Sequence, residues 1–322
     1  MFGVHAQHSR LRLSRPEVFA ILCFAGISGA LALAALRAGV LLFRSTITPA
    51  HRLDPARRTI AIVFCIVGIT MVACVLYARY VEPFRLTIRR ETVALPGLTA
   101  PLRLVAFSDV HCDPRFPVED HLVEVINQQH ADVIVFLGDS LNAAAQAGLF
   151  SRTLARLQAP VKLAIRGNWD VWYWWDIDLF GDTGFSEIES GWRTIDVHGI
   201  PLRVGGHAFV DAWSPKKVLP PPPPGPGPTI FLYHATDYAH VAADNGVSLY
   251  LDGDTHGGQI AIPLYGPLLS IGRRGREFTH GLYHLGPATV VVTPGIGVER
   301  GFPFRFLVPP EITVLDLIPT SH

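Results

Sequence analysis

The hydrophobic positions of this chain follow two patterns, long runs near its beginning and short runs in the remainder. Residues 18–36 and 59–77 are near-continuous apolar stretches without a charged residue, and arginines precede each of them. Each stretch is close to the roughly twenty residues that cross the hydrocarbon layer of a membrane as a helix. We therefore expect residues 1–92 to form an N-terminal membrane anchor with two transmembrane helices, at about 18–36 and 59–77.

Two other structures give rise to similar runs. A basic start followed by an apolar segment is typical of a cleavable signal peptide, and helices buried in a soluble domain are also apolar. The apolar pattern resumes after Arg37, over residues 38–43, and a second run follows, which favours a two-helix anchor. The arginines on the outer sides of the two runs slightly outnumber those between them, so the positive-inside rule places the C-terminal part in the cytoplasm.

From residue 93 onward the apolar runs are short, rich in β-branched residues and bounded by glycine or turn residues, which predicts buried strands. Five of them lie at residues 104–107, 133–137, 161–165, 230–232 and 247–251. Polar side chains follow directly after these runs, and they are Asp109, His111, Asp139, Asn168, His234, Asp254 and His256. Because open α/β folds bind ligands where their strands end, we expect all seven side chains to converge on one edge of a sheet.

Carboxylates, imidazoles and an amide oxygen are the ligands of divalent metal ions of borderline hardness. Seven such groups exceed what one ion needs, whereas two ions that share a bridging carboxylate account for the number and suit attack on a phosphate ester. Taken singly, Asp139 or Asn168 is more often a turn or helix-cap residue, and His234 an interior or surface histidine. The order of the motifs and the dense Gly-Asp-Thr-His-Gly-Gly-Gln at residues 253–259 together favour a metal site.

The series Asp109-Val110-His111, Gly138-Asp139, Gly167-Asn168, His234 and residues 253–259 resembles the signature of the calcineurin-like metallophosphoesterase superfamily. The resemblance covers about residues 98–318. The Gly-Gly-Gln sequence and the Pro310-Glu311-Ile312 near the end look like the membrane-associated bacterial branch that includes the YkuE-type enzymes. The resemblance implies that residues 93–322 form an α/β metallophosphoesterase domain, a two-sheet β-sandwich flanked by helices.

The resemblance also implies how the ligands are shared between two divalent metal ions, of manganese, iron or zinc. Asp109, His111 and His256 would hold one ion, and Asn168, His234 and Asp254 the other. Asp139 would bridge the two ions and hold the metal-bridging water that attacks the substrate.

Two positions depart from the family pattern. Trp169 stands where the family has a histidine that contacts the phosphoryl group or protonates the leaving oxygen, and an indole is not a general acid at neutral pH. Asp254 replaces the first histidine of the Gly-His-x-His motif, and its carboxylate is still a competent ligand. We therefore expect a phosphohydrolase, and the alternative is a non-catalytic membrane-bound sensor of a phosphate ligand or metal, with a degraded hydrolase site.

Other features bear on the substrate. The arginines after the Gly-Gly-Gln sequence, Arg273, Arg274 and Arg276, either meet a second phosphate or an anionic headgroup, or form a solvated basic loop. The aromatic cluster Trp169, Trp172, Tyr173, Trp174 and Trp175 is either an apolar wall for acyl chains, an interfacial anchor or core packing. We expect a mixture of these roles, with Trp169 facing the site.

The composition bears on which classes of partner the chain binds. The 27 basic and 27 acidic residues balance, so we expect no nucleic acid to bind. We expect the lipid bilayer and a phosphorylated small molecule or lipid as partners, for example a nucleotide-linked lipid such as UDP-diacylglucosamine. We also expect the protein to lie in a bacterial-type inner membrane as a multi-pass protein.

Cys112 follows the candidate ligand His111 and is expected to be a small buried residue rather than a thiolate ligand.

Overall fold

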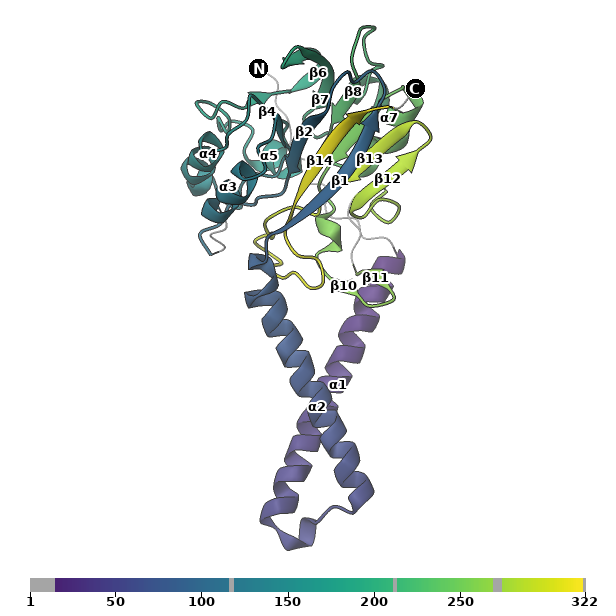
Figure 1. Ribbon diagram of the computed structural model, residues 1–322. Helices are drawn as coiled ribbons and strands as arrows, with labels where there is room; N and C mark the ends of the chain where they lie inside the picture. The colour runs from purple at the N-terminus through teal and green to yellow at the C-terminus, as the bar shows by residue number, and fades with distance from the viewer. Residues whose placement is uncertain (1–14, 116–118, 211–212, 269–273, 321–322) are drawn as a thin grey trace. The chain divides into compact units, whose positions relative to one another are not determined.

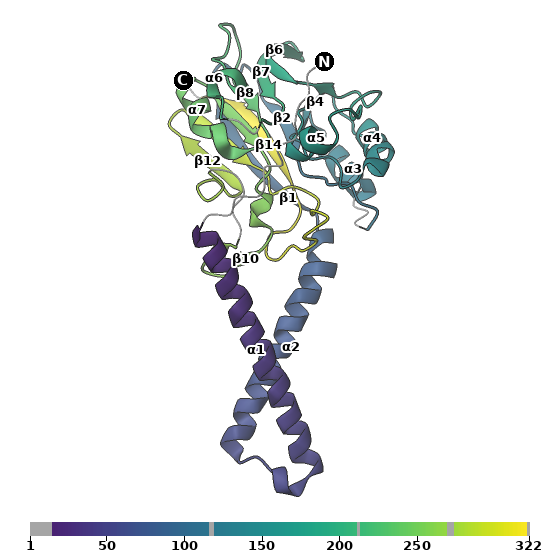
Figure 2. The ribbon, with the colours of Figure 1, turned by 180° about the vertical axis from the view of Figure 1, so that it is seen from behind.

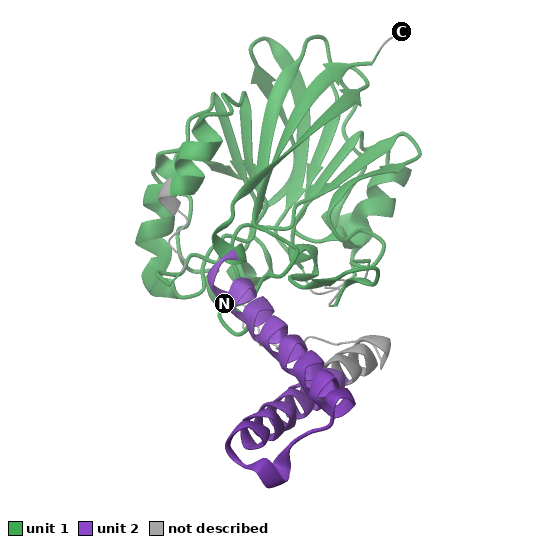
Figure 3. Cartoon of the chain, turned by 60° about the horizontal axis from the view of Figure 1, so that its bottom comes forward, with its two compact units in different colours: residues 1–10, 82–322 green, residues 11–81 purple. Residues whose placement is uncertain are grey.

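The computed structural model describes residues 15–115, 119–210, 213–268 and 274–320, and its contacts divide the chain into two compact units. Unit 2 spans Leu11–Val81, and unit 1 begins at Glu82 and continues to the C-terminus (Figure 3). The sequence pattern placed this boundary after residue 92. It lies earlier because β1, Thr87–Leu95, pairs along its whole length with β14, Glu311–Pro319, and so belongs to unit 1.

Unit 2 consists of two long apolar helices, α1 (Arg15–Ile47) and α2 (Pro55–Tyr80), joined by the short 3₁₀ helix η1 (Pro49–His51). Asp54 caps α2 by accepting a hydrogen bond from the Arg57 N–H at 3.0 Å. Both helices are long and apolar enough to cross a membrane, because an 18-residue window within Ala25–Ile47 has a mean hydropathy of 1.8 and one within Pro55–Phe84 a mean hydropathy of 2.8, and 6% of each window is buried. Helix α1 extends beyond the expected 18–36 because the apolar run that resumes after Arg37 continues the same helix.

Unit 1 contains two six-stranded mixed sheets (Figure 1). The first has the order β1, β14, β2 (Leu102–Phe107), β3 (Val133–Phe136), β4 (Val161–Ala164) and β5 (Ser186–Glu187). The second has the order β12 (Gly281–Leu285), β13 (Ala288–Val292), β9 (Leu249–Asp252), β8 (Thr229–Leu232), β7 (Ile200–His207) and β6 (Ser190–Val197). A separate hairpin pairs β10 (Ala261–Ile262) with β11 (Gly266–Pro267).

The strands that lead to the candidate site run parallel. Strands β2, β3, β4 and β5 pair in parallel in the first sheet, and β13, β9, β8 and β7 do so in the second. All four residues of β3, β8 and β9 are buried, as expected of strands that are covered on both faces. The predicted strands were therefore correct to within about two residues at their ends.

The alternation of side chains along each strand builds the layers. On β2, Leu104 and Ala106 point into the core between the two sheets, whereas Val105 and Phe107 point outward to the helices. The outer face of the first sheet is covered by α3 (Glu119–Asn127) and α4 (Ala147–Ala155). The outer face of the second sheet is covered by α7 (Ala239–Asp244), as Figure 2 shows from behind. The predicted two-sheet sandwich flanked by helices is confirmed.

The shorter helices lie in the loops between these layers. They are α5 (Asn168–Tyr173), α6 (Pro215–Val218), η2 (Glu82–Phe84), η3 (Ala144–Gln146), η4 (Thr236–Tyr238) and η5 (His256–Gly258). The proline-rich segment 219–228 connects α6 to β8 within unit 1 and is not a domain boundary.

Candidate metal centre

The seven predicted side chains lie together where the parallel strands of both sheets end. Asp109 and His111 follow β2, Asp139 follows β3, and Asn168 begins α5 after β4. From the second sheet, His234 follows β8, while Asp254 and His256 follow β9. All seven are buried or nearly so, none being more than 9% exposed.

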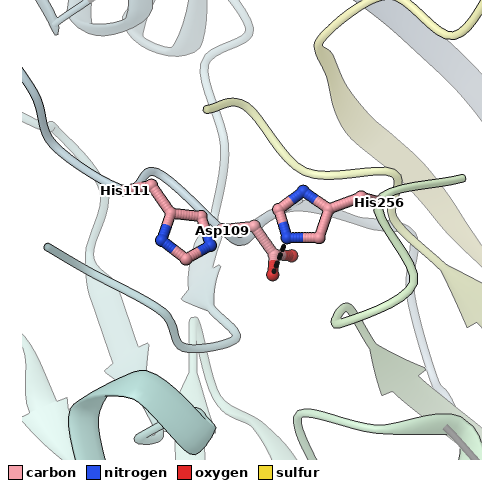
Figure 4. A group of neighbouring side chains, drawn as sticks. All are labelled: Asp109, His111 and His256. Atoms are coloured by element: carbon pink, nitrogen blue, oxygen red, sulfur yellow. Dashed lines mark ion pairs between the residues drawn. The ribbon is translucent and has the colours of Figure 1, made fainter. Parts of the chain in front are cut away.

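The first group of side chains comprises Asp109, His111 and His256, whose possible ligand atoms all lie within 4.8 Å of one another (Figure 4). The His256 Nε2 atom is 3.4 Å from Asp109 Oδ1. The rings of His111 and His256 stack with their centres 5.2 Å apart. Two imidazoles and one carboxylate thus face a common point, as protein ligands of a divalent ion do.

The second group comprises Asp109, Asp139 and His234, also within 4.8 Å of one another. The Asp139 Oδ2 atom lies 3.4 Å from His234 Nε2 and 3.6 Å from His111 Nε2, so it faces histidines of both groups. Asp109 contributes to both groups as well, because its Oδ1 atom is 3.9 Å from His234 Nε2. Asp254 Oδ1 adds a further oxygen 3.6 Å from the same nitrogen.

Asn168 completes the second group. Its carboxamide oxygen points at His234 Nε2, 2.8 Å away, and at Asp139 Oδ2, 3.1 Å away, and only an amide turned over would form hydrogen bonds to these acceptors. Turned over, the amide donates to these acceptors, and in the other orientation its oxygen can serve as a ligand of a cation.

Several buried polar atoms of the centre have no hydrogen-bond partner within the part of the chain that the structure describes. They include Asp109 Oδ1, both ring nitrogens of His111 and Nδ1 of His256. A buried polar atom without a partner costs about 1–3 kcal/mol, and native structures contain few. A divalent cation would satisfy the inward-facing atoms at once, so the side chains present fit the metal ions that the sequence predicts.

Without a cation the carboxyl groups of the centre retain protons. Burial raises the pKa of Asp139 to about 7 and that of Asp254 to about 8, and it raises the pKa of Asp109 as well. Burial alone would lower the pKa of His234, but the surrounding carboxylates, Asp139 first, outweigh it and raise that pKa well above its ordinary value. Protons and metal ions therefore compete for these side chains.

The two other histidines stay neutral. Burial lowers the pKa of His111 to about 3 and lowers that of His256 well below its ordinary value, with the positive charge of Arg305 acting in the same direction. A neutral imidazole keeps a lone pair for a metal ion.

We expect the metal-free protein to lose stability as the pH rises from about 6.5 to about 8. The folded carboxyls of Asp139 and Asp254 titrate near 7 and 8, but the unfolded ones near 4, so folding retains protons that the rising pH removes. His111 and His256 oppose this trend only below about pH 6.5, where the unfolded histidines take up protons.

Thermal unfolding of chelator-treated protein measures the effect. Its Tm should fall between pH 6.5 and pH 8, and added Mn²⁺ should raise the Tm more at the higher pH. A metal-free Tm that climbs across this interval would contradict the assignment of these pKa shifts.

The backbone of the centre is held in an uncommon conformation. Five candidate ligands have a positive φ: Asp109 (51°), His111 (42°), Asp139 (61°), Asp254 (63°) and His256 (49°). Residues other than glycine adopt this region rarely, and such strained positions cluster at functional sites. Their concentration here supports a site that depends on the direction of these side chains.

Two glycines allow the loops after β3 and β4 to touch. A Cβ atom on Gly138, whose φ is +100°, would lie 2.3 Å from the Gly167 nitrogen. A Cβ atom on Gly167 would lie 2.2 Å from Asp139 Oδ1. The glycines of the Gly-Asp and Gly-Asn motifs are thus required by the close approach of Asp139 and Asn168.

Groups behind the ligands fix their direction. The His234 Nδ1 atom contacts the Leu137 carbonyl at 2.7 Å, which assigns the proton to Nδ1 and leaves Nε2 facing the carboxylates. The fully buried Asp170 accepts hydrogen bonds from the backbone N–H groups of Asp139 (2.8 Å), Ser140 (3.0 Å) and Gly167 (2.9 Å). Asp170 therefore joins the Asp139 loop to the start of α5.

Two acidic residues at the centre were missed in the sequence. Asp170 had a signal, because an acidic residue at the third position of a helix can accept a hydrogen bond from the N-cap N–H, as Asp170 does from Gly167. Asp252, at the end of β9, is fully buried and neither carboxyl oxygen has a hydrogen-bond partner in the described ranges. Burial raises its pKa well above the ordinary value, and the Asp254 carboxylate adds to this. Only its place at a strand end, two residues before Asp254, marks it in the sequence.

The aromatic cluster forms a wall beside the centre. The Trp169 ring meets the His111 ring edge-on with centres 5.1 Å apart, and it also packs on Tyr173 at 5.3 Å. Trp172 packs on Tyr173 at 6.3 Å and on Phe209 at 5.8 Å, and Phe209 meets the His234 ring at 6.3 Å. We call Trp169, Trp172, Tyr173 and Phe209 the aromatic wall. It runs from one candidate metal group to the other.

The rest of the cluster has a packing role. Trp174 donates its indole N–H to the Leu141 carbonyl at 3.0 Å and packs against the core outside the first sheet. Trp175 is half exposed and lies on the Arg166 guanidinium, 5.3 Å from the ring centre. Cys112 is buried in the same outer core, bridged to Leu141, which agrees with a packing role.

Of the predicted substrate arginines, Arg274 and Arg276 belong to the described residues. Arg273 lies outside the described residues. Arg274 forms an ion pair with Glu277 at 2.8 Å, and Glu277 also contacts His240 at 2.6 Å. Arg276 is exposed. A role of these arginines in substrate binding remains a prediction.

The fold and the seven converging side chains define the class: this chain belongs to the calcineurin-like metallophosphoesterases, metal-dependent hydrolases of phosphoric esters. The model of the calcineurin-like phosphoesterase family matches residues 102–258, from the start of β2 to the end of η5. The chain is 32% identical over 260 residues to the uncharacterized metallophosphoesterase YkuE of Bacillus subtilis (strain 168), covering 76% of this chain and 90% of that protein.

The chain is also similar to other phosphoesterases. The phosphodiesterase YaeI of Escherichia coli (strain K12) is 27% identical over 259 residues, covering 75% of this chain and 92% of that protein. Among solved structures, TT1561 of Thermus thermophilus is 16% identical, with a TM-score of 0.38, and the match covers 62% of this chain and 91% of that chain.

Proposed function

We propose that this protein is a membrane-anchored phosphohydrolase that uses two divalent metal ions to hydrolyse a phosphoester or pyrophosphate bond of an amphiphilic substrate. The observation that carries the proposal is the position of Asp139 Oδ2, between His111 Nε2 at 3.6 Å and His234 Nε2 at 3.4 Å. One carboxylate oxygen between the histidines of two ligand groups is what a pair of ions requires of a bridging ligand.

In this proposal Asp109, His111 and His256 hold one ion, Asn168, His234 and Asp254 hold the other, and Asp139 is shared. When bound, the ions lower the pKa of a water molecule and neutralise the charge that develops on the phosphoryl oxygens. The chain itself keeps the ligands in place. The Leu137 carbonyl holds the His234 ring in the tautomer whose Nε2 is free, and Asp170 holds the loop of Asp139.

The aromatic wall and the apolar helices support an amphiphilic substrate. Trp169, Tyr173, Trp172 and Phe209 give the centre an apolar flank, along which an acyl chain or a nucleobase packs while its phosphate meets the metal ions. We propose a nucleotide-linked lipid such as UDP-diacylglucosamine, or a simpler phospholipid, as the substrate. Manganese, iron and zinc are the candidate metals, since all bind imidazole and carboxylate ligands.

Turnover of a soluble chromogenic phosphodiester by the purified, detergent-solubilised chain tests the proposal. We expect chelation to abolish hydrolysis and Mn²⁺ or another divalent ion to restore it, because two groups of buried carboxylate and imidazole side chains are placed to hold cations. Elemental analysis of the reloaded protein should give about two metal ions per chain. Metal binding without turnover of any phosphodiester would instead support the alternative, a membrane-bound sensor with a degraded hydrolase site.

Membrane anchoring is proposed from unit 2. Over its two apolar runs no exposed side chain is charged and most are apolar, for example Leu33, Leu36, Ile66, Ile69 and Val72, each 58% or more exposed. Such helices are stable in lipid but not in water. We propose a multi-pass protein of a bacterial inner membrane with unit 1 in the cytoplasm.

We expect the full chain to sediment with membranes and to leave them only in detergent, not in alkaline carbonate. A chain that begins at Glu82 should be soluble and should keep its activity on soluble phosphodiesters, because no candidate ligand precedes Asp109. Recovery of the full chain from cells in the soluble fraction without detergent would contradict the two-helix anchor.

A further inference from the structure

Unit 1 exposes apolar side chains at one end, outside the metal centre. They belong to the tip of the β10–β11 hairpin, Leu264 and Tyr265, and to the segment Phe302–Leu307 that precedes β14. Leu264 is fully exposed, and Tyr265 and Leu307 are 55% and 52% exposed. Figure 1 and Figure 2 show the hairpin and this loop at the same end of unit 1. We call these residues the interfacial surface.

The two parts of the interfacial surface are joined through their backbones. Ile260 forms a β-bridge with Phe306, and the Ala261 N–H donates to the Phe306 carbonyl at 2.9 Å. Within the loop, the rings of Phe302 and Phe304 pack with their centres 5.5 Å apart and are partly exposed. The exposed leucines therefore project from one connected framework and not from two independent loops.

Leu264 and Leu307 combine a backbone conformation that is unfavourable for leucine with a side chain that is exposed to water. Leu264 has a φ of 67° and Leu307 a φ of 58°, the left-handed region that glycine and asparagine adopt readily and leucine does not. Each position thus combines backbone strain with exposure of a large apolar side chain. Strain of this kind persists where it serves a function, and an apolar phase around the side chains would offset the exposure.

The interfacial surface lies near the point where the chain enters unit 1 from the apolar helix α2. Only Val81 separates α2 from Glu82. The entering chain is bonded to the segment after the loop, because the Thr87 N–H donates to the Pro310 carbonyl at 2.8 Å, and Phe84 nearby is 40% exposed.

The interfacial surface also adjoins the metal centre along the chain. Strand β10 begins at Ala261, shortly after the candidate ligand His256 in η5. A Cβ atom on Gly257 would lie 2.5 Å from Val308 Cγ1, so η5 packs directly against the residue that follows the loop. A molecule that leaves a bilayer at this surface has the metal centre next to it.

We propose that the interfacial surface enters the headgroup region of the bilayer that holds the anchor, and that a phosphorylated amphiphile passes along it to the metal centre. The membrane contact is inferred from the exposed Leu264 and Leu307, which have a positive φ and belong to the part of unit 1 near its first residues. The passage of substrate rests on the proposed function. The partner is a lipid surface. The same chain carries two apolar helices, and exposed apolar side chains such as Leu264 and Leu307 match the boundary between the headgroups and the acyl chains of a bilayer.

Fluorescence quenching tests the membrane contact without turnover. The four native cysteines are replaced by alanine in the full chain, Leu264→Cys carries a fluorophore, and the protein is reconstituted in phosphatidylethanolamine and phosphatidylglycerol vesicles with nitroxide-labelled lipid. We expect the nitroxide to quench the label at Leu264 at least threefold more than a label at Ile318→Cys. Ile318 is a matched exposed apolar residue, near the end of β14 that is remote from the loop.

Equal quenching at the two positions would overturn the proposal. A label shielded from soluble quenchers but not reached by the nitroxide lipid would also overturn it, because the surface would then contact another protein chain.

Substrate passage is tested by the double variant Leu264→Asn and Leu307→Asn, since asparagine tolerates a positive φ and should not lower the Tm. The probes are a hexadecyl 4-nitrophenyl phosphodiester embedded in the same vesicles and a soluble bis(4-nitrophenyl) phosphate. We expect kcat/KM for the embedded ester to fall at least tenfold and that for the soluble ester to stay within twofold. Ile318→Asn should change neither.

The outcomes separate this inference from the proposed function. Unchanged hydrolysis of the embedded ester by the double variant would overturn the passage of substrate along the surface. A wild-type protein that cleaves only the soluble ester would refute the amphiphilic substrate, while quenching at Leu264 would still support the membrane contact. Absence of hydrolysis of both esters, with quenching intact, would refute the proposed enzyme and keep the contact.

Discussion

Replacement of Asp139 by asparagine is expected to reduce phosphodiester hydrolysis by roughly a thousandfold, more than any other single change at the centre. Charge stabilisation by metal ions contributes several kcal/mol to such reactions, and each 1.4 kcal/mol or so corresponds to a tenfold rate. The Asp139 Oδ2 atom faces both His111 and His234, so its loss weakens the binding of both proposed ions. The measurements are kcat/KM and the metal content of the variant after dialysis against Mn²⁺.

The fold should survive Asp139→Asn, which makes the test specific. The Asp139 Oδ1 atom accepts a hydrogen bond from the Trp169 N–H at 2.9 Å, and the amide oxygen of asparagine can accept the same bond. The change also removes a buried carboxyl whose pKa is raised to about 7, so the metal-free variant should unfold at a Tm no lower than that of the wild type.

A matched control is Asp244→Asn, at an exposed position on α7, which should alter neither activity nor metal content. If the Asp139 variant retained two ions and a rate within tenfold of the wild type, Asp139 would not be a bridging ligand.

Replacement of Trp169 by histidine is expected to raise the rate on esters with poor leaving groups, by roughly a hundred- to ten-thousandfold, the range that general acids supply. The indole cannot protonate a leaving oxygen, and its ring lies edge-on to His111, beside the centre. A histidine side chain is smaller and its backbone N–H can still donate to Asp139. Wild-type rates should therefore depend strongly on the pKa of the leaving group, with aryl or nucleotide groups cleaved far faster than alkyl groups.

Two roles of Trp169 are distinguished by comparing kcat and KM for a short aryl ester and a long-chain lipid ester. If the ring is chiefly part of a wall for acyl chains, Trp169→His should raise KM for the lipid and leave kcat on the aryl ester alone. Trp169→Phe is the control, because phenylalanine keeps an apolar ring and adds no proton donor. Unchanged constants for both esters in the histidine variant would show that Trp169 lies outside the site.

The sequence by itself determined the identity of the candidate ligands and their place at strand ends. Runs such as 133–137 and 230–232 bury both faces of a strand, so their continuous apolar character is a local signal. The polar residue that follows each run needs no tertiary information to be noticed. In the same way the lengths of the two apolar runs predicted helices α1 and α2, because helix length is a local property.

Tertiary structure alone decided how distant segments support the centre. Asp170 binds the backbone of Asp139, and Ser108 contacts Thr293 far along the chain, contacts that no local pattern reveals. Unit 1 begins at Glu82 and not at residue 93, as the sequence pattern predicted, because β1 pairs with β14, which lies near the other end of the chain. The bridge between Ile260 and Phe306, which joins the segments that carry Leu264 and Leu307, likewise forms only in the folded chain. Local hydrophobic periodicity specifies which elements form, whereas hydrogen bonds and packing between distant elements decide which polar groups meet and which apolar groups stay exposed.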